Sequence, residues 1–403
     1  MNDRIRTLAR QHAPCYLYEY DVMQRQVETL RRAFPRYDLL YSIKANPFPP
    51  VVRALAGLGL GADAASAPEV LLSRRCGMAP ADIFFSAAGK TDAALETAWD
   101  GCELIADSLG EVARIGALCQ KKGQRRAIGV RMNPAFGMGG AAGGPSKFGI
   151  NEEDLPQLKT LLANLPVTVE GIHVHLRSQN LDADVLGGCY RDSWALAGRV
   201  RDALNCEMRY VNFGSGVGVA YDETFEQPMD LSRLRTYTDA IAADNDATLQ
   251  ARLMIETGRF PTAQAGTYWL RVVDKKSSRG KTYVIVENCM NGLQKPAIAA
   301  MLRHELGGKT PAPYEPLFTS DWAFPIVAHG DGAVTETVDI VGNLCCAADV
   351  LAEGFTGPGL DVGDLIEVRN AGAYACTLTA QRFSSHRPPE ELLVYGDGRV
   401  ETE

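Results

Sequence analysis

Lys44 is the first residue of the sequence whose type and setting could do chemistry. It ends a short apolar run in the segment YSIKANP. Two interpretations are open at this point. A lysine there can simply mark where a strand leaves the core. Its amine can also form a Schiff base, which a partly desolvated site favours by lowering the pKa of the amine.

Two further segments carry groups suited to a phosphorylated ring cofactor. The turn FGSGVGV places Gly214, Ser215 and Gly216 after a predicted strand, and glycines let backbone N–H groups converge on a phosphate. The segment ETGR puts the carboxylate of Glu256 three residues before the guanidinium of Arg259. An acid facing a pyridine nitrogen and an arginine facing a phosphate are what pyridoxal phosphate requires, although the same pair is also typical of a surface ion pair.

His173 and His175 form an H-V-H pattern, and a period of two places both side chains on one face of a strand. The same pattern occurs in metal hydrolases built on barrels, so a zinc site is the alternative. Such a site needs ligands from later strands. The remaining histidines, at positions 12, 304, 329 and 386, lie outside any later strand end, so we expect no metal.

These residues share a setting, because each follows a short apolar run that alternates with helix-like segments such as Asp21–Phe34 and Asp184–Leu204. Eight such runs predict a (β/α)8 barrel, in which functional residues gather at the C-terminal strand ends. An open doubly wound sheet is the alternative, and it usually stops at about five or six strands. The predicted strands are Leu39–Ile43, Gly61–Ala65, Asp82–Ser86, Leu104–Asp107, Ala127–Met132, Val167–Val174, Arg209–Phe213 and Arg252–Ile255.

After Pro261 the pattern changes to strand-like runs with turn residues and little helical periodicity, which predicts a β-rich second domain. We assign residues 22–262 to the barrel, and 1–21 and 263–403 to the β-rich domain. The strand-like segment Cys15–Tyr20 precedes the barrel and could pair with it. The Gly-rich segment FGMGGAAGGP, residues 136–145, is predicted to be a loop past the fifth strand.

Composition narrows the class of protein. The 403 residues include 41 Lys and Arg against 49 Asp and Glu, a net charge of −8, which argues against a nucleic-acid surface. No apolar run has the length of a membrane span, and the N-terminus has no signal-peptide pattern. The 10 cysteines contain no C-x-x-C pattern, as expected of reduced thiols in a cytoplasmic enzyme.

Taken together and in order, the motifs resemble the fold-type III pyridoxal-phosphate decarboxylases, which include diaminopimelate and ornithine decarboxylases. The resemblance implies a (β/α)8 barrel with a β-domain similar to alanine racemase, bound pyridoxal 5′-phosphate, and a homodimer in which each active site is completed by the neighbouring subunit. The matching segments are YSIKANP, GADAASAPEV, GVRMNP, SKFGI, GIHVHLRSQ, NFGSGVGV, IETGRF, VGNLCCAADVLA, and DVGDLIEVRNAGAY followed by FSSHRPPE.

The resemblance also implies roles for single residues. Lys44 would hold the cofactor covalently, His175 would stack on its ring, Glu256 would pair with the ring nitrogen, and Cys345 of the neighbouring subunit would return a proton to Cα. Asp63 and Arg131 would lie near Lys44 and the ring hydroxyl. The phosphate cradle would comprise Ser178, the Gly214–Gly216 turn, Gly258, Arg259 and Tyr374.

The sequence departs from the family where the substrate is bound. Cys346 stands where the family has an acid that grips a distal amine, and Arg177 stands where it has a glycine. Lys295 replaces the carboxylate-binding arginine of diaminopimelate decarboxylases. An acidic clamp is lost and cations are kept, so we expect carboxylates at the distal end of the substrate, met by Arg177, Lys295, and Arg303 or His304.

The chain looks similar to the branch of the family that serves citrate-based siderophore pathways, through FFSAAGKTDAAL, the Gly-rich segment and HLRSQNLD. Enzymes of this branch decarboxylate citryl-conjugated amino acids such as citryl-diaminopropionate or citryl-serine. Diaminopimelate decarboxylation is the alternative within the family. A catalytically silent regulator is the alternative outside it, disfavoured because Lys44, His175, Glu256 and Cys345 are all retained. A racemase is disfavoured because its β-domain would supply a catalytic tyrosine.

Overall fold

The structure is a computed structural model that describes residues 3–224, 226–307, 324–330 and 334–403. The chain divides into two compact units, which are described separately. We call Gln26–Val219 with Pro228–Gly258 the barrel unit. Met1–Arg25, Ala220–Gln227 and Arg259–Glu403 form the sheet unit. The predicted domain boundaries at residues 22 and 262 stay a prediction.

The barrel unit, all of which is described, contains eight parallel strands in the order β5-β4-β3-β2-β10-β9-β8-β6, and pairing of β5 with β6 closes the ring. This confirms the predicted (β/α)8 barrel, and the closing pair excludes an open sheet. The strands are β2 (Asp38–Ser42), β3 (Gly61–Ala64), β4 (Ile83–Phe85), β5 (Glu103–Ala106), β6 (Arg126–Asn133), β8 (Val167–His173), β9 (Tyr210–Asn212) and β10 (Arg252–Thr257).

Side chains from opposite strands fill the barrel interior. The ring of Tyr210 packs there with Leu40, Phe84, Ile105 and Met254. This placement depends on glycine in the strands beside it. A Cβ on residue 129 would lie 2.2 Å from the Tyr210 hydroxyl oxygen, and a Cβ on residue 171 would lie 2.3 Å from a Tyr210 ring carbon. A filled interior means that functional side chains are displayed at the ends of the strands.

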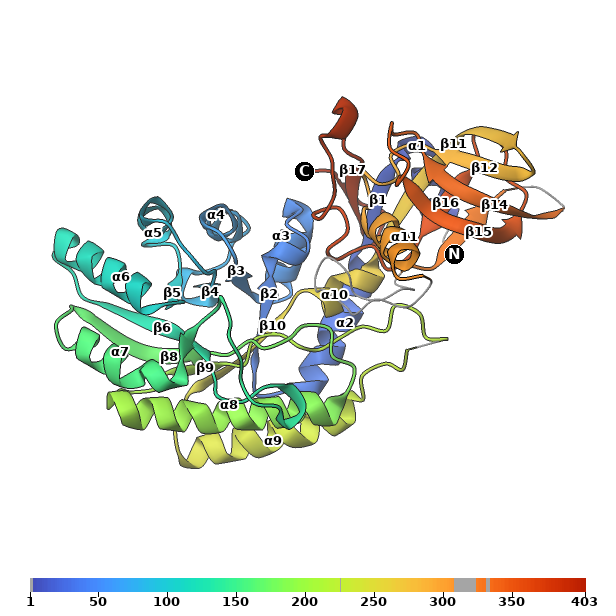
Figure 1. The fold of residues 1–403 in the computed structure, drawn as a ribbon. Coiled ribbons are helices and arrows are strands. Elements are labelled where there is room, and N and C mark those ends of the chain that lie inside the picture. The colour runs from blue at the N-terminus through green and yellow to red at the C-terminus, as the bar shows by residue number, and fades with distance from the viewer. Residues whose placement is uncertain (1–2, 225, 308–323, 331–333) are drawn as a thin grey trace. The chain divides into compact units, whose positions relative to one another are not determined.

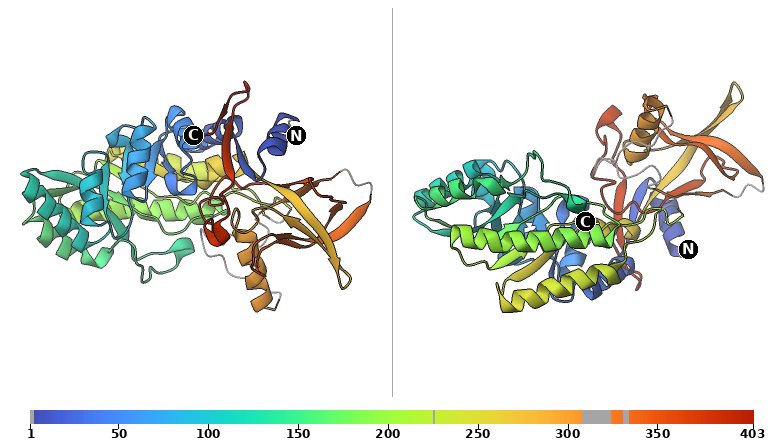
Figure 2. Two further views of the ribbon diagram at one scale, coloured as in Figure 1. Left: turned by 90° about the horizontal axis from the view of Figure 1, so that it is seen from above. Right: turned by 60° about the horizontal axis from the view of Figure 1, so that its bottom comes forward.

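Helices surround the strands (Figure 1, Figure 2). Several begin where a side chain caps the first turn: the hydroxyls of Ser66, Thr91 and Ser108 and the carboxylates of Asp182 and Asp230 each accept a backbone N–H. The helices of this layer are α2 (Tyr20–Ala33, which begins in the sheet unit), α3 (Pro49–Gly57), α4 (Ala67–Arg75), α5 (Asp92–Ala98), α6 (Leu109–Lys122), α7 (Leu155–Leu162), α8 (Ala183–Leu204) and α9 (Leu231–Ala247).

The described part of the sheet unit contains one sheet of nine strands. Its core packs Cys15, Leu17 and Trp269 against apolar side chains of the first helix. The elements are α1 (Asp3–His12), β1 (Cys15–Glu19), α10 (Arg259–Thr262), β11 (Gly266–Ser278), β12 (Lys281–Val286), α11 (Lys295–Glu305), β13 (Ile326–His329), β14 (Thr335–Gly342), β15 (Val350–Pro358), β16 (Leu365–Val368), β17 (Glu390–Val394) and β18 (Val400–Glu401).

Two expectations for this region need correction. The segment Cys15–Tyr20 does not pair with the barrel: β1 is antiparallel to β11 and parallel to β17. The β-rich part also contains a helix, α11, which begins at Lys295 with Pro296 in its first turn. In a helix the ring of proline is tolerated at that position because the N–H it lacks would have no partner there.

Candidate active site

Lys44 lies in a short 3-10 turn, Ile43–Ala45, directly after β2. Its Nζ is 2.7 Å from Oδ2 of Asp63 at the end of β3. Asp63 is fully buried, and its Oδ1 accepts a hydrogen bond of 2.6 Å from the Ser86 hydroxyl. The Lys44 side chain keeps 45% of its surface exposed, so its amine is held by a buried carboxylate and remains accessible at the barrel mouth.

Glu256, near the end of β10, is a buried carboxylate with two polar neighbours. Its Oε1 accepts a 2.9 Å hydrogen bond from the Asn212 amide and lies 3.2 Å from His173 Nε2. Burial opposes ionisation, but His173 and the Lys44 cation outweigh it and hold the pKa of Glu256 well below its usual range. The arrangement therefore offers a buried negative charge, which suits a protonated ring nitrogen.

His175 lies just past the end of β8. Its Nδ1 accepts a hydrogen bond of 3.0 Å from the Ser215 backbone N–H, and its Nε2 is 3.4 Å from the Ser178 hydroxyl. Burial, with the Arg131 and Lys44 cations adding to it, lowers the pKa of His175 to about 3, although Glu256 acts in the opposite direction. The ring is therefore neutral near pH 7, as suits a group that stacks on an aromatic cofactor.

Two positions of the glycine turn after β9 leave no room for a side chain. Gly214 has φ +66°, and a Cβ there would lie 2.5 Å from the Val174 carbonyl oxygen. At Gly216 a Cβ would lie 2.5 Å from a Leu186 methyl. The Gly214 N–H binds the Asn212 side chain at 2.9 Å, so this turn is tied to the carboxylate of Glu256 through one amide.

The sheet unit holds a cluster of cations and aromatic rings. The buried Arg259 donates a 2.7 Å hydrogen bond from Nη1 to the Tyr221 hydroxyl, and its Cζ lies 4.8 Å from the centre of the Tyr374 ring. The buried Lys295 places Nζ 5.8 Å from the same ring centre. Tyr374 has φ +52°, a strained conformation for a bulky residue that is often found at functional sites.

Cys345 and Cys346 lie on a tight turn of the sheet unit, the first exposed and the second half-buried. The Cys346 N–H binds the Leu344 carbonyl at 2.8 Å. The buried Asp349 carboxylate accepts the Leu344 and Met290 backbone N–H groups at 2.9 and 2.7 Å. The Asp349 carboxylate therefore anchors the turn, and Cys345 is exposed on the surface of that turn.

Two predicted substrate residues lie away from Lys295. Arg303 and the exposed His304 are in α11, about 12 Å further along the helix axis at the usual rise per residue. His304 Nδ1 lies 3.8 Å from a Glu305 carboxylate oxygen. Arg177 is exposed on the segment that follows β8, beside Ser178. The structure brings Lys295 close to the aromatic cluster, but does not bring Arg303 or His304 there.

Sequence reasoning missed two buried or half-buried acids next to predicted residues. Glu69 in α4 accepts the Ala65 N–H at 2.6 Å, while its own N–H binds the Ser66 hydroxyl at 3.3 Å. The S-x-x-E spacing of a capping box could have found it. Asp107, which follows β5, has Oδ1 3.6 Å from Arg131 Nη1; no motif marks it.

The described residues contain no helix that could span a membrane and no group of three or more His, Cys, Asp or Glu side chains arranged to hold a metal ion. Residues 20–263 match the family described as pyridoxal-dependent decarboxylase, pyridoxal binding domain.

Relatives match over almost the full chain. The L-glutamyl-[BtrI acyl-carrier protein] decarboxylase of Niallia circulans is 30% identical over 95% of this chain and 89% of that protein. The diaminopimelate decarboxylase of Methanothermobacter thermautotrophicus is 28% identical over 95% and 87%. The diaminopimelate decarboxylase of Helicobacter pylori, solved with L-lysine, superposes with a TM-score of 0.80 over 96% of this chain and 93% of that one, at 24% identity.

The residues present fit pyridoxal 5′-phosphate. An accessible amine lies at a strand end, a buried carboxylate is held ionised, and a turn admits only glycine at two positions. When bound, this cofactor supplies a ring that accepts the electron pair left behind when a carboxylate leaves the substrate. The chain belongs to the pyridoxal-dependent decarboxylases and is a pyridoxal-phosphate-dependent carboxy-lyase acting on an amino acid.

Proposed function

We propose that the enzyme removes the α-carboxylate of an L-amino acid conjugated to a carboxylate-rich group, a citryl-diaminopropionate or citryl-serine type substrate of siderophore biosynthesis. The observation that carries the proposal is Lys295. It is a buried cation, 4% exposed, with Nζ 5.8 Å from the Tyr374 ring centre and 5.9 Å from that of Phe324. Its positive charge beside the aromatic cluster supports an anionic group of the substrate there.

Two further features support an anionic distal group. Cys346, which has no carboxylate, stands where an acid would bind a distal amine. The exposed Arg177 adds a cation next to Ser178. The N. circulans relative acts on a glutamyl group carried by a protein, which supports a conjugated amino acid as the class of substrate.

The predicted roles of the residues follow the geometry within each unit. Lys44 would bind the cofactor, Asp63 would position the Lys44 amine through their 2.7 Å contact, and neutral His175 would lie against the ring. Glu256 would bind the ring nitrogen. Cys345 would carry a proton to Cα, from the second subunit of a homodimer. Arg131, Ser178, Gly214, Ser215, Gly216, Gly258, Arg259 and Tyr374 would complete cofactor binding.

Diaminopimelate decarboxylation is the second candidate, because full-length relatives with that name are 25–28% identical to this chain. The two candidates differ in the charge at the distal end of the substrate. Diaminopimelate carries an amine there as well as a carboxylate, and Cys346 provides no carboxylate to bind that amine.

The proposal is tested with purified protein in two steps. A visible absorbance band that borohydride abolishes, present in the wild type and in Lys159→Ala but absent from Lys44→Ala, establishes the cofactor and its attachment. Lys159 is an exposed lysine of α7 and serves as the control. Release of CO2 from a citryl-conjugated amino acid, and not from diaminopimelate, is the expected result. The reverse preference would overturn the substrate assignment.

A further inference from the structure

The Gly-rich segment leaves the barrel after β6 and returns through the short strand β7 (Ile150–Asn151), which pairs in parallel with β6. Its two ends are joined by side-chain hydrogen bonds. The Asn133 amide donates to the Gly144 carbonyl at 3.1 Å and to Asn151 Oδ1 at 2.9 Å. Within the segment, the Gly137 N–H binds the Ala141 carbonyl at 2.7 Å. The segment is therefore a loop whose two ends are held together by hydrogen bonds, and it rejoins the barrel at β7.

Gly149, where the loop rejoins the barrel, packs closely against the end of β6. Gly149 has φ +82°, and a Cβ there would lie 2.7 Å from the Asn133 backbone nitrogen and 2.8 Å from the Met132 carbonyl carbon. Only glycine fits such a close approach in the left-handed region. Next to it, the Phe148 ring lies 4.4 Å from the guanidinium carbon of Arg131, so the returning segment stacks directly on a predicted cofactor-binding residue.

Asp107 lies next to both Arg131 and the returning end of the Gly-rich segment. Its Oδ1 is 3.6 Å from Arg131 Nη1, and the Gly149 backbone N–H lies near enough to favour the charged form of the carboxylate. The Asp107 and Arg131 side chains are 5% and 9% exposed. Burial raises the pKa of Asp107, and Arg131, the Gly149 N–H, Lys90 and His173 all favour its charged form. One buried carboxylate therefore faces a cation and a backbone donor from two different segments.

We propose that Asp107 is a positioning residue that locks the guanidinium of Arg131 and the returning end of the Gly-rich segment into one arrangement. The role of Arg131 in holding the cofactor rests on the proposed function, whereas the link between Asp107, Arg131 and Gly149 does not. Removing the Asp107 charge takes away the carboxylate that pairs with Arg131 at 3.6 Å, so the guanidinium and the Phe148 ring that stacks on it shift together.

A matched control lies in the next helix. Glu111 is a buried carboxylate of α6 that pairs with the buried Lys90 at 2.6 Å. Glu111→Gln therefore breaks a buried ion pair of the same kind, and Glu111 contacts neither Arg131 nor Gly149 by hydrogen bond or ion pair among those found in the barrel unit. Any general loss of stability appears in both variants, and an effect specific to the Gly-rich segment appears only in Asp107→Asn.

The first measurement is amide hydrogen exchange of the cofactor-free protein. Asp107→Asn is expected to speed exchange of residues 146–151 by about tenfold or more, with Glu111→Gln leaving that segment unchanged and Asp107→Glu restoring part of the protection. Phe148→Ala removes the second contact to Arg131 from a partly exposed position and should act in the same direction. Unchanged exchange of residues 146–151 in both Asp107→Asn and Phe148→Ala would overturn the proposal.

The second measurement separates this proposal from the proposed function. In the cofactor-loaded protein, Asp107→Asn is expected to shift the pH dependence of the visible absorbance band, because Arg131 then carries a charge that Asp107 no longer balances. Faster exchange with an unshifted band would support positioning by Asp107 and contradict the assignment of Arg131 to the cofactor site.

Discussion

Lys295 offers the most direct test of substrate charge at the scale of one residue. Lys295→Met keeps the unbranched stem and removes the ammonium group. If this cation binds a distal carboxylate equally in the ground state and transition state, KM for a citryl substrate rises by about 10- to 100-fold while kcat changes little. Lys295→Arg should keep most of the affinity. Steady-state kinetics measure both quantities.

The control for this substitution is Lys276→Met, which removes an exposed lysine of β11. It should leave both constants at the wild-type values. A Lys295→Met enzyme with an unchanged KM for the citryl substrate would contradict the proposed contact, and a fall in kcat alone would place Lys295 in a different role.

Glu69 is a half-buried carboxyl group whose proton affinity depends on the folded barrel. Burial raises the pKa of Glu69 to about 7; the Ala65 N–H lowers it, the Asp63 charge raises it further and the Lys44 charge lowers it. The unfolded chain releases this proton near pH 4.5, so between about pH 4.5 and 7 the folded chain holds more protons. Stability therefore falls as the pH rises through that window, by up to about 3 kcal/mol.

Glu69→Gln removes this titration and mimics the protonated acid. We expect the cofactor-free variant and wild type to have similar melting temperatures near pH 5, and the variant to be more stable by a few degrees near pH 8. Glu153→Gln, at an exposed acid of the barrel unit, is the matched control and should not reproduce this gain in stability near pH 8. If the difference in melting temperature between Glu69→Gln and wild type is equal at pH 5 and pH 8, the Glu69 carboxyl is ionised at both.

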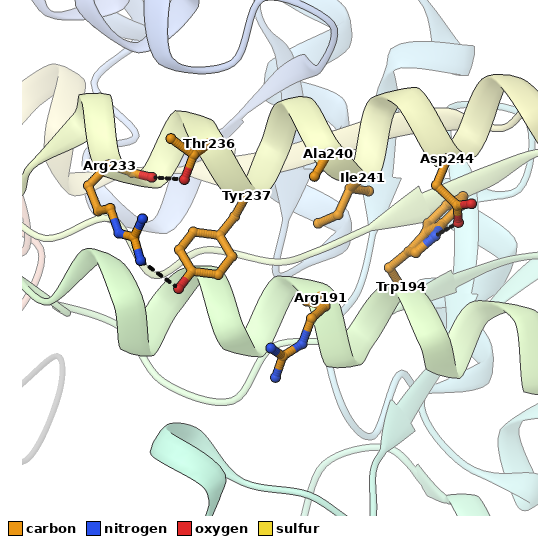
Figure 3. A pocket seen from close by; sticks show the side chains of 8 residues that line it. All are labelled: Arg191, Trp194, Arg233, Thr236, Tyr237, Ala240, Ile241 and Asp244. Carbon is orange, nitrogen blue, oxygen red and sulfur yellow. Dashed lines mark hydrogen bonds between the residues drawn. The ribbon is translucent and has the colours of Figure 1, made fainter.

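At the scale of an element, two adjacent glycines of α8 have opposite surroundings. The Tyr237 ring of α9 packs against Gly187, where a Cβ would lie 2.3 Å from a ring carbon, whereas a Cβ at Gly188 meets nothing within 4 Å. Tyr237 is held in place by a hydrogen bond of 2.9 Å from its hydroxyl to Asp184. It forms one wall of a groove of about 400 Å³ between α8 and α9 (Figure 3).

Gly187→Ala must therefore displace the ring, and we expect it to lower the free energy of unfolding by about 1–3 kcal/mol. Gly188→Ala should be neutral or should stabilise the helix by up to about 1 kcal/mol, because alanine favours the helical backbone. Thermal unfolding of the two variants side by side measures the difference. Equal effects would mean that α9 moves away from α8 at little cost.

The secondary-structure elements also differ in whether the sequence alone could predict them. The eight barrel strands could be predicted because each is a short, mainly apolar run whose residues are mostly buried. Strand β15 could not, because Gly354 adopts φ +61° within it and much of its surface is exposed. Its pairing with β14 defines it. The partners of β1 lie about 250 and 375 residues further along the chain, and such distant pairing leaves no local pattern.

The same limit applies to the candidate site. Lys44, Glu256 and the glycine turn stand in recognisable motifs at strand ends, so their grouping followed from the barrel. Asp107 belongs to no motif and gains its role only from the return of the chain at Gly149, 42 residues later. The separation of His304 from Lys295 depends on α11, a helix that the sequence pattern did not reveal.

At the scale of the whole molecule, the predicted chemistry is divided between the two units. Lys44, His175 and Glu256 belong to the barrel unit, and Cys345 belongs to the sheet unit. The family resemblance implies a homodimer in which Cys345 serves the active site of the neighbouring subunit. In a mixed dimer of Lys44→Ala and Cys345→Ala subunits, both substitutions then fall in the same site, so one site carries both lesions and the other carries none.

Mixing the two inactive variants in equal amounts, under conditions that let subunits exchange, is expected to restore about one quarter of wild-type activity per total protein. Random pairing makes about half of the dimers mixed, and each mixed dimer has one intact site out of two. Each variant alone, and Lys44→Ala mixed with the Lys44→Ala/Cys345→Ala double variant, should stay inactive. If exchange is confirmed with labelled subunits and no activity returns, Cys345 acts within its own subunit and the shared-site arrangement is wrong for this enzyme.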